Sequence, residues 1–318
     1  GSFYYAGFSV AGPADMNGDG INDIAIGSYN GPSGRGRMHV VYGQSGGFGT
    51  NAINLNTITG GAAGYYIEGE NAGDILSTAM GIAGDVNGDG ISDIIVGSSY
   101  IGANGAAYVV YGVAGTRASI DLNAGGGISA ADGFEITGAG SPWAATLSGG
   151  GGDFNGDGVS DVVLSASQYG GSNGRTAVLF GDTGALTLGT PSAAQGFLID
   201  GAGGERAGTA IALNDDVNGD GLADLLVGAF AADNNAITNS GSAYLIFGQS
   251  GLPNTGAVLS TYADGVQGFR VDGAAFNRRL GEAAAMADVN GDGCADLLLG
   301  EPNTGVGGVY VIYGGQAQ

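Results

Sequence analysis

One nine-residue string recurs five times along the chain and constrains the fold more than any other feature. Every copy reads Asp-x-Asn-Gly-Asp-Gly-x-x-Asp, and the copies start 70, 68, 63 and 72 residues apart. The copies begin at Asp15, Asp85, Asp153, Asp216 and Asp288. A motif that returns at such a spacing is typical of architectures in which one supersecondary unit is copied. The sequence therefore predicts five copies of one structural unit.

The same short apolar runs surround each string in the same order, as the second copy illustrates. Thr78–Ile82 precedes the string and Ile94–Ser98 follows it, and then come Ala107–Gly112 and, after a variable loop, Phe134–Gly138. Runs of β-branched and aromatic residues bounded by Gly, Asn and Asp indicate strands. Four strands per repeat of this length are typical of a propeller blade. A helical solenoid would need a 3.6-residue apolar period, which is absent.

The string itself is rich in side-chain oxygens that could coordinate a metal ion. Positions 1, 3, 5 and 9 carry Asp, Asn, Asp and Asp, while Gly at positions 4 and 6 permits the positive φ angles of a closed loop. Such oxygens repel one another unless a hard cation lies among them, and Ca²⁺ accepts six to eight of them. Position 7 would add its backbone carbonyl, and its apolar side chain would plug the loop onto the core. The predicted ligands are Asp15, Asn17, Asp19, Ile21 and Asp23; Asp85, Asn87, Asp89, Ile91 and Asp93; Asp153, Asn155, Asp157, Val159 and Asp161; Asp216, Asn218, Asp220, Leu222 and Asp224; and Asp288, Asn290, Asp292, Cys294 and Asp296.

Two other kinds of loop share part of this pattern. An EF-hand or dockerin-type loop needs a carboxylate at position 12 and flanking helices. Position 12 is apolar in all five copies, so that alternative fails. The other alternative is an Asp/Asn/Gly turn without metal, which five in-phase copies with every ligand position intact disfavour. We therefore expect about five structural Ca²⁺ ions.

The resulting expectation is an all-β fold, a β-propeller of five four-stranded blades with a calcium loop in each blade. The alternative is part of a larger, seven-bladed propeller. Residues 1–318 are expected to form a single domain, with repeats at approximately 1–69, 70–138, 139–201, 202–273 and 274–318. The last repeat lacks an outer strand, which Phe3–Ala6, a longer chain or a neighbouring molecule would supply. A closed five-bladed ring is favoured.

The net charge and the composition limit the classes of partner that the chain is expected to bind. The chain has 69 Gly, but 43% of its residues are hydrophobic, which favours a folded protein over disorder. It carries 30 acidic residues against 8 basic ones, all Arg, for a net charge of −22. Such a charge repels phosphate backbones and anionic lipid, so nucleic acid and direct membrane insertion are excluded as expectations. A lone Cys294 forms no internal disulfide, which leaves metal binding to stiffen the fold.

The strings and the strands around them resemble the FG-GAP repeats of integrin α subunits. The resemblance is specifically to a secreted integrin-like protein of bacterial type. The FG half is matched by Gly133-Phe134, Gly196-Phe197 and Gly268-Phe269, whereas the GAP half keeps its proline only in Gly300-Glu301-Pro302. The resemblance implies calcium in the hairpin between strands one and two. It also implies a secreted protein, extracellular or at the cell surface, that serves as a binding or adhesion module.

The resemblance further implies a ligand face opposite the calcium loops. Loops between strands two and three, and from each outer strand to the next blade, would gather there and recognise a protein or glycan ligand. Aromatic and Arg side chains dominate binding hot spots. The expected ligand contacts are Trp143, Tyr29, Tyr100, Tyr169, Phe230 and Arg278.

We expect no enzyme, because outside the loops no catalytic constellation is visible. His39 is the single histidine and lies within a predicted strand, so a Ser-His-Asp arrangement has one poor candidate. Two alternative functions stay open. One is a structural subunit of a surface layer or extracellular filament that self-associates through terminal strands. The other is a carbohydrate-active or phospholipase-type propeller enzyme.

Overall fold

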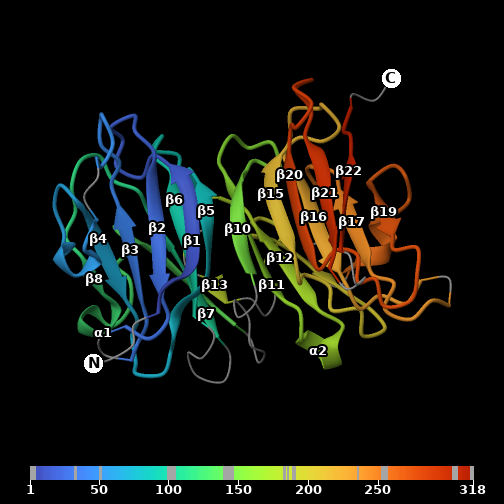
Figure 1. Ribbon diagram of the computed structural model, residues 1–318, viewed down its shortest axis with the longest axis horizontal. Helices are drawn as coiled ribbons and strands as arrows, with labels where there is room; N and C mark the ends of the chain where they lie inside the picture. The colour runs from blue at the N-terminus through green and yellow to red at the C-terminus, as the bar shows by residue number, and fades with distance from the viewer. Residues whose placement is uncertain are drawn as a thin grey trace. The chain divides into compact units, whose positions relative to one another are not determined.

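A computed structural model shows an all-β chain whose strands form five sheets in chain order (Figure 1). The structure describes residues 5–31, 34–49, 52–98, 105–138, 147–181, 184, 186–187, 191–234, 236–251, 257–302 and 307–315. The chain divides into two compact units. The first comprises residues 1–148 with 184–187, and the second comprises residues 149–183 with 188–318. The first unit holds two sheets and the second holds three.

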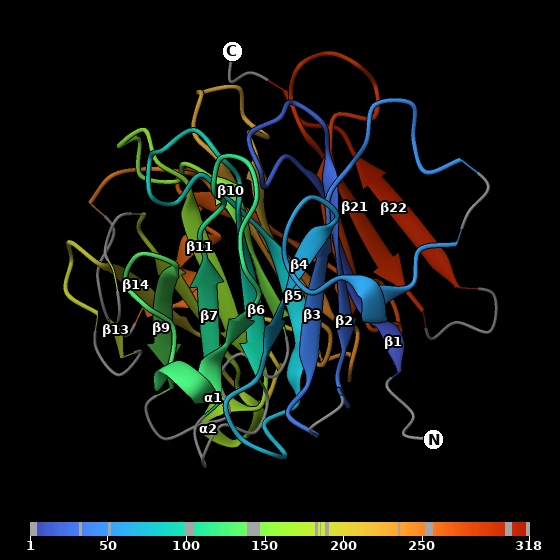
Figure 2. The ribbon, with the colours of Figure 1, turned by 90° about the vertical axis from the view of Figure 1, so that its left-hand side faces the viewer.

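The first unit contains two five-stranded sheets, whose strands lie side by side in Figure 2. The first sheet has the order β1-β2-β3-β4-β8, with β1 Ala6–Ala14, β2 Asp23–Ser28, β3 Arg37–Val41, β4 Gly64–Glu68 and β8 Ile120–Asp121. The second has the order β13-β9-β7-β6-β5, with β5 Leu76–Gly84, β6 Asp93–Ser98, β7 Ala106–Val110, β9 Gly133–Thr137 and β13 Leu186–Thr187.

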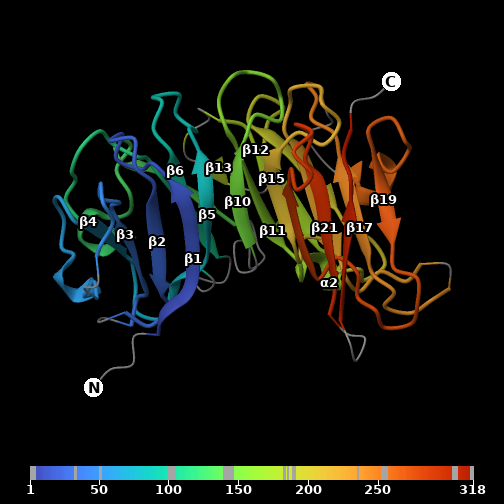
Figure 3. The same cartoon turned by 45° about the horizontal axis from the view of Figure 1, so that its top comes forward.

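The second unit contains the other three sheets, drawn from another side in Figure 3. The third sheet runs β10-β11-β12-β14-β18, with β10 Leu147–Gly152, β11 Asp161–Ala166, β12 Arg175–Leu179, β14 Gly196–Asp200 and β18 Ala257–Val258. The fourth runs β15-β16-β17-β19, with β15 Ile211–Asp215, β16 Asp224–Ala229, β17 Ser242–Ile246 and β19 Gly268–Asp272. The fifth runs β20-β21-β22, with β20 Ala283–Ala287, β21 Asp296–Glu301 and β22 Gly308–Ile312.

Helices are few and short. Those in the described residues are η1 Leu55–Thr57, α1 Leu122–Gly125, α2 Tyr169–Ser172 and η2 Leu259–Tyr262. Within the described part of the chain, no helix has the length and apolarity that a membrane crossing requires.

The predicted propeller blades are confirmed as antiparallel meanders. The first four sheets contain the four expected strands, and the fifth contains three within the described residues. Three sheets also gain a fifth strand, because β8, β13 and β18 each come from the next repeat and pair in parallel with β4, β9 and β14. Ala6 pairs with Ser28 inside the first sheet, so it is not part of a strand that completes the fifth sheet. Closure of a five-bladed ring stays a prediction.

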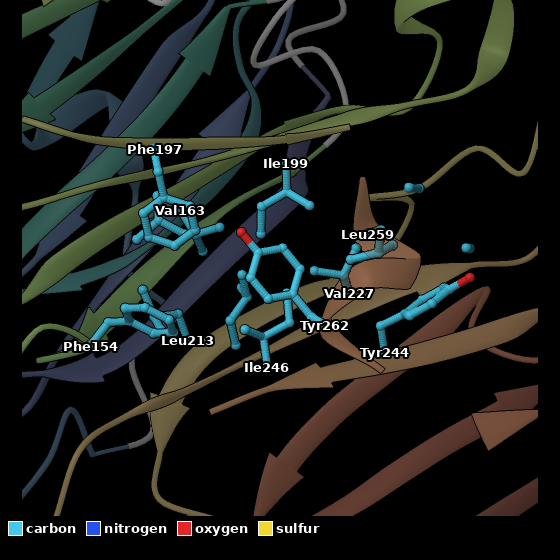
Figure 4. Close-up of a cluster of buried hydrophobic side chains, with 14 of the residues drawn as sticks. Phe154, Val163, Phe197, Ile199, Leu213, Val227, Tyr244, Ile246, Leu259 and Tyr262 are labelled. Carbon is cyan, nitrogen blue, oxygen red and sulfur yellow. The ribbon is translucent and has the colours of Figure 1, made fainter. Parts of the chain in front are cut away.

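The core lies between successive sheets of each unit. Strands β6, β7, β11, β16 and β17 are buried at every residue, which explains why their sequences read as continuous apolar runs and not as alternating ones. In the second unit, one cluster joins the third and fourth sheets and includes Phe154, Phe197, Ile246 and Tyr262 (Figure 4). Burial on both faces holds the ends of these five strands, and the loops attached to them, in place.

Candidate metal centres

Each nine-residue string forms the hairpin loop between the first and second strands of a sheet. Position 9 opens the second strand, as the pairs Ala14↔Asp23 and Ala287↔Asp296 show for the first and last sheets. The glycines at positions 4 and 6 have positive φ in all five copies, for example 70° at Gly18 and 80° at Gly20. The conformational role predicted for these glycines is confirmed.

The position 1 carboxylate organises the loop by accepting backbone hydrogen bonds. In the first loop, Oδ1 of Asp15 accepts from Gly18 N at 2.8 Å and Asp19 N at 3.2 Å, and Oδ2 accepts from Gly20 N at 2.8 Å. The bond from position 6 recurs in every loop, at 2.7–2.9 Å. Such local Asx bonds fold the loop around its own acidic side chains.

Positions 3 and 5 complete an oxygen-rich rim. Oδ1 of Asn17 accepts from Asp19 N at 3.0 Å, the same N–H that contacts Asp15, so these two side-chain oxygens converge on one point. Asn17 also donates through Nδ2 to Oδ2 of Asp19 at 3.1 Å. The same Asn-to-Asp bond occurs in the other four loops. Two carboxylates and an amide are thus held together at a half-exposed hairpin tip.

This donor set fits Ca²⁺, because it consists of hard oxygens in a loop that can adjust. Within the described residues, however, no group of three or more His, Cys, Asp or Glu side chains is already gathered as a metal cluster. The loop carboxylates are turned toward backbone N–H groups instead. Metal ligation by positions 1, 3, 5, 7 and 9 therefore remains a prediction.

Position 9 has a second role that the sequence did not reveal. Its carboxylate is buried in all five loops, and Oδ2 accepts the backbone N–H of position 2 at 2.8–3.0 Å. Oδ1 accepts from the glycine two residues after the third strand, at 2.7–3.0 Å. Each position 9 carboxylate therefore ties its loop to the third strand.

Burial dominates the electrostatics of position 9. It raises the pKa of Asp93 and of Asp161 to about 7 and that of Asp224 to about 6, and it raises the pKa of Asp23. The two backbone donors act in the opposite direction, while the carboxylates at positions 1 and 5 add to the rise. A cation among these carboxylates would favour their ionised forms.

The apolar side chain at position 7 packs as expected. A Cβ built on Gly43 would lie 2.6 Å from Ile21 Cγ2, so Ile21 lies directly against the end of the third strand. Ile91 occupies the same place against Gly112 and also lies close to Gly18 of the preceding loop. Cys294 is the buried equivalent in the last loop.

The first, third and fourth loops are also bonded to the next sheet of their unit. Asp15 O accepts from Ser92 N at 3.0 Å, and Met16 O accepts from Val113 N at 3.2 Å. In the second unit, Asp153 O accepts from Ala223 N at 2.9 Å and Asp216 O from Ala295 N at 2.8 Å. Stiffening one loop therefore also stiffens the junction between two sheets.

Three of the expected ligand contacts, Tyr29, Tyr169 and Phe230, lie at the opposite end of the sheets, where the second and third strands are joined. Arg278 lies in the connection from β19 to β20. Tyr169 lies under the Arg175 guanidinium, 3.8 Å from Cζ to the ring centroid, and Arg175 pairs with Asp200. Tyr29 stacks on Tyr5 with ring centroids 4.9 Å apart. Arg278 pairs with Glu301 at 3.4 Å, and Trp143 and Tyr100 lie outside the described residues.

Phe230 is flanked by two guanidinium groups that belong to equivalent positions of two repeats. Arg279 Cζ lies 4.2 Å and Arg206 Cζ 5.6 Å from its ring centroid. Arg206 and Arg279 have φ of 56° and 60°, a left-handed conformation that non-glycine residues rarely adopt. Ile75, at the equivalent point of an earlier repeat, has φ 54°. An alignment of the five repeats would place these residues at one equivalent position, but it would not reveal their left-handed backbone conformation.

His39 lies in the middle of β3. Its side chain is buried, and neither ring nitrogen has a hydrogen-bond partner within the described residues. Burial lowers the pKa of its imidazole to about 4, and the Arg37 charge acts in the same direction. The ring packs edge-on to Tyr66 with centroids 6.0 Å apart.

Comparison with known proteins gives the repeats their family. The FG-GAP repeat matches residues 6–42, 145–179 and 280–312, which span the first three strands of the first, third and fifth sheets. The remaining two sheets carry the same nine-residue string.

Curated relatives match over the same repeats. Phosphatidylinositol-glycan-specific phospholipase D of Bos taurus is 38% identical over 107 residues, which is 31% of this chain and 12% of that protein. The Dictyostelium discoideum protein of the same name is 28% identical over 170 residues, 49% of this chain and 18% of that protein. Integrin alpha-4 of Xenopus laevis is 28% identical over 193 residues, 59% of this chain and 17% of that protein.

The aligned part is thus less than a fifth of each relative's length. The chain carries FG-GAP repeats of the integrin-like kind, folded as all-β propeller blades.

Proposed function

We propose that the chain is a calcium-stabilised extracellular module that binds a protein or glycan ligand through the loops opposite its metal loops. The observation that carries the proposal is the convergence of the position 1 and position 3 oxygens on one backbone N–H, as in Asp15 and Asn17. The loop around this point recurs in all five sheets. Clustered oxygens of this kind suit a hard divalent cation.

The proposed role of calcium is structural. Extracellular calcium modules bind with Kd of roughly 10⁻⁴ to 10⁻³ M, so at millimolar calcium each site adds about 0.4–1.4 kcal/mol to the free energy of unfolding. Five independent sites add about 2–7 kcal/mol, a large share of a typical stability of about 5–15 kcal/mol. The effect reaches beyond each loop, since loop carbonyls such as Asp15 O accept hydrogen bonds from the next sheet.

The proposed ligand face carries aromatic rings beneath guanidinium groups. Phe230 with Arg206 and Arg279, and Tyr169 with Arg175, present flat apolar surface beside hydrogen-bond donors. Acidic or hydroxyl-rich groups of a protein or glycan match this chemistry. An extracellular location accords with millimolar calcium and with the integrin-like repeats.

The calcium proposal is tested by a thermal melt with and without EGTA, together with the metal content of the purified chain by mass spectrometry. A loss of about 2–7 kcal/mol would lower Tm by roughly 3–10 °C for a chain of this size. A metal-free chain with an unchanged Tm would overturn the structural role of calcium.

The ligand-face proposal is tested separately on glycan and protein arrays. Phe230→Ala and Trp143→Ala are expected to abolish binding at unchanged Tm. Val266→Ala is the matched control, because Val266 is exposed just before β19, at the end of the sheet where the metal loops lie. Equal loss of binding in the control would contradict a localised ligand face.

The two alternative functions are tested by separate assays. Several relatives are named phospholipase D, but the match is confined to the repeats, so we propose a non-enzymatic module. Turnover of a glycolipid or polysaccharide by the purified chain would favour the enzyme. Filaments whose assembly requires the terminal strands would favour a structural subunit.

A further inference from the structure

One backbone hydrogen bond joins neighbouring metal loops of a unit. In the first unit, Ser92 N, at position 8 of the second loop, donates to Asp15 O, at position 1 of the first loop, at 3.0 Å. In the second unit, the fourth loop donates to the third in the same way at 2.9 Å, and the fifth donates to the fourth at 2.8 Å. The donors and acceptors there are Ala223 with Asp153 and Ala295 with Asp216.

The peptide group that donates this bond also supplies a predicted calcium ligand to its own loop. Ser92 N and Ile91 O belong to one peptide, and the backbone carbonyl of Ile91 is the position 7 ligand of the second loop. Because the peptide bond is a resonance system, a cation held at Ile91 O would draw electron density from the nitrogen. Ser92 N–H would then be a stronger donor to Asp15 O.

The acceptor peptide leads on to a carboxylate of the first loop. Asp15 O belongs to the peptide between Asp15 and Met16, and Met16 N donates to Oδ2 of Asp23 at 2.9 Å. Asp23 is the position 9 ligand of the first loop. Two peptides and two hydrogen bonds therefore connect a ligand atom of the second loop, Ile91 O, with the Asp23 carboxylate of the first.

The same path is present in the second unit, where it is buried. Phe154 N donates to Asp161 Oδ2, and Val217 N donates to Asp224 Oδ2, both at 2.8 Å. All four side chains are buried. In such surroundings hydrogen bonds are stronger than in water, and consecutive bonds polarise one another. A change at one loop is therefore transmitted to the preceding loop with little screening by solvent.

A side-chain contact joins the same pairs of loops. A Cβ built on Gly156, at position 4 of the third loop, would lie 3.2 Å from Cδ2 of Leu222, at position 7 of the fourth. Gly18 and Ile91 have the same relationship, at 3.3 Å from Cδ1. Gly156 N also donates to Asp153 Oδ1 at 2.6 Å. Fixing Leu222 therefore also restricts the glycine that positions the Asp153 carboxylate.

We propose that neighbouring loops within a unit bind calcium with positive cooperativity, through the peptide that joins position 7 of one loop to position 1 of the preceding loop. The inference rests on the proposed calcium loops and adds the coupling between them. It links the first loop with the second, the third with the fourth and the fourth with the fifth. Occupancy of one loop orients the position 9 carboxylate of the preceding loop before that loop is filled. Thermodynamic linkage makes the effect reciprocal.

Charge alone predicts the opposite sign of coupling. A loop with three Asp side chains and one divalent ion has a net charge of −1, whereas an empty loop in which Asn replaces one Asp has a net charge of −2. Emptying a loop in this way would therefore strengthen calcium binding at its neighbour. Position 5 carboxylates such as Asp157 and Asp220 are exposed, and charges there are screened over about 8 Å at physiological salt. The sign of the coupling separates the two effects.

The test measures calcium affinity loop by loop, from the nuclear magnetic resonance shifts of the position 6 glycine amides at physiological salt. Gly158 reports on the third loop, because its N–H donates to Asp153 Oδ2 at 2.8 Å. Asp220→Asn removes a ligand from the fourth loop and is expected to weaken calcium binding at the third about fivefold. Asp19→Asn is the matched control in the first loop, which bonds to the second sheet, and should change it by less than about twofold.

The outcomes separate this inference from the proposed function. Equal effects of Asp220→Asn and Asp19→Asn, or tighter binding at the third loop in Asp220→Asn, would overturn the coupling. Reciprocity adds a second check, since Asp157→Asn should weaken the fourth loop by the same factor. Calcium binding at five independent loops would overturn this inference alone, whereas a lack of binding at every loop would overturn the calcium proposal with it.

Two further measurements do not need the fourth-loop variant. In the unsubstituted chain, Gly158 and Gly221 should respond to calcium together and more steeply than a single independent site. In Asp157→Asn, calcium at the fourth loop should still move the Phe154 N–H resonance downfield, because its hydrogen bond to Asp161 becomes stronger. A Phe154 resonance that does not follow Gly221 would contradict transmission through the shared peptides.

Discussion

Asp161 accepts a hydrogen bond through Oδ1 from the backbone N–H of Gly181 at 3.0 Å, across 20 residues of chain. Its Oδ2 accepts from Phe154 N at 2.8 Å, and the side chain is buried. One carboxylate thus fastens the loop to both its own start and the third strand. The arrangement recurs in every sheet, so position 9 acts as a structural tie independently of any metal.

Asp161→Asn is therefore expected to destabilise the chain even in EGTA. The amide keeps one acceptor, but its NH₂ group faces a backbone N–H, so a buried donor loses its partner. Such a loss costs about 1–3 kcal/mol. Denaturant unfolding monitored by circular dichroism, in EGTA and in CaCl₂, measures it.

Asp157→Asn is the matched control in the same loop. Asp157 is exposed at position 5, so its substitution is expected to cost less than about 1 kcal/mol in EGTA and distinctly more in CaCl₂. Equal costs of Asp161→Asn and Asp157→Asn in EGTA would show that the tie contributes nothing beyond ligation.

Gly196→Ala is expected to destabilise the third sheet severely. Gly196 has φ 138°, and an added Cβ would lie 2.1 Å from Val178 O, so the alanine must separate β14 from β12. We expect a loss above about 3 kcal/mol. Gly203→Ala, where φ is 60° and nothing lies within 4 Å, should cost about 1 kcal/mol. Urea midpoints of the two variants test the difference.

The strands and loops could be predicted because each depends on the local sequence. Alternation of apolar runs with Gly, Asn and Asp placed four strands in each repeat, and the spacing of Asp and Gly placed the loops. The added strands β8, β13 and β18 were not predictable. Each is two residues long, and Ile120–Asp121 has no periodicity of its own, so its pairing depends on what tertiary packing brings beside β4.

The candidate sites show the same division. The predicted ligands at positions 1, 3 and 5 could be identified from their residue types, but the hydrogen bond between Asp161 and Gly181 joins residues far apart in sequence. Likewise, aromatic loop residues were identified individually, whereas the pairing of Phe230 with Arg206 and Arg279 arises from three separate loops. Long-range contacts of this kind leave no local pattern.

His39 is expected to make stability depend on pH. Its pKa is lowered from the usual 6.5 to about 4, so its contribution is present above pH 6.5 and is lost as the pH falls toward 4. The full contribution is at most about 3 kcal/mol. His39→Tyr removes this contribution to stability. Tyrosine is the residue found at the equivalent strand position in two other repeats, as Tyr108 and Tyr244.

The readout for His39 is the difference in unfolding free energy between wild type and His39→Tyr at pH 7.5 and at pH 4.5, in saturating CaCl₂. Taking this difference cancels the contribution of the buried carboxyls, which is the same in both proteins. Their raised pKa values act with the opposite sign, because they favour the folded state as the pH falls. A difference that stays constant between the two pH values would contradict the burial of a neutral imidazole.

Arg206→Asn tests whether the strained position beside Phe230 serves binding and not stability. Asn tolerates the left-handed conformation better than Arg, and relief of about 1 kcal/mol of strain should offset the cation–π contact of about 0.5–1 kcal/mol that is lost. The free energy of unfolding should therefore stay within about 1 kcal/mol of wild type, while binding on the glycan and protein arrays falls. A loss of more than about 2 kcal/mol with binding intact would make Arg206 a structural residue, because Phe230 would then need its guanidinium for packing alone.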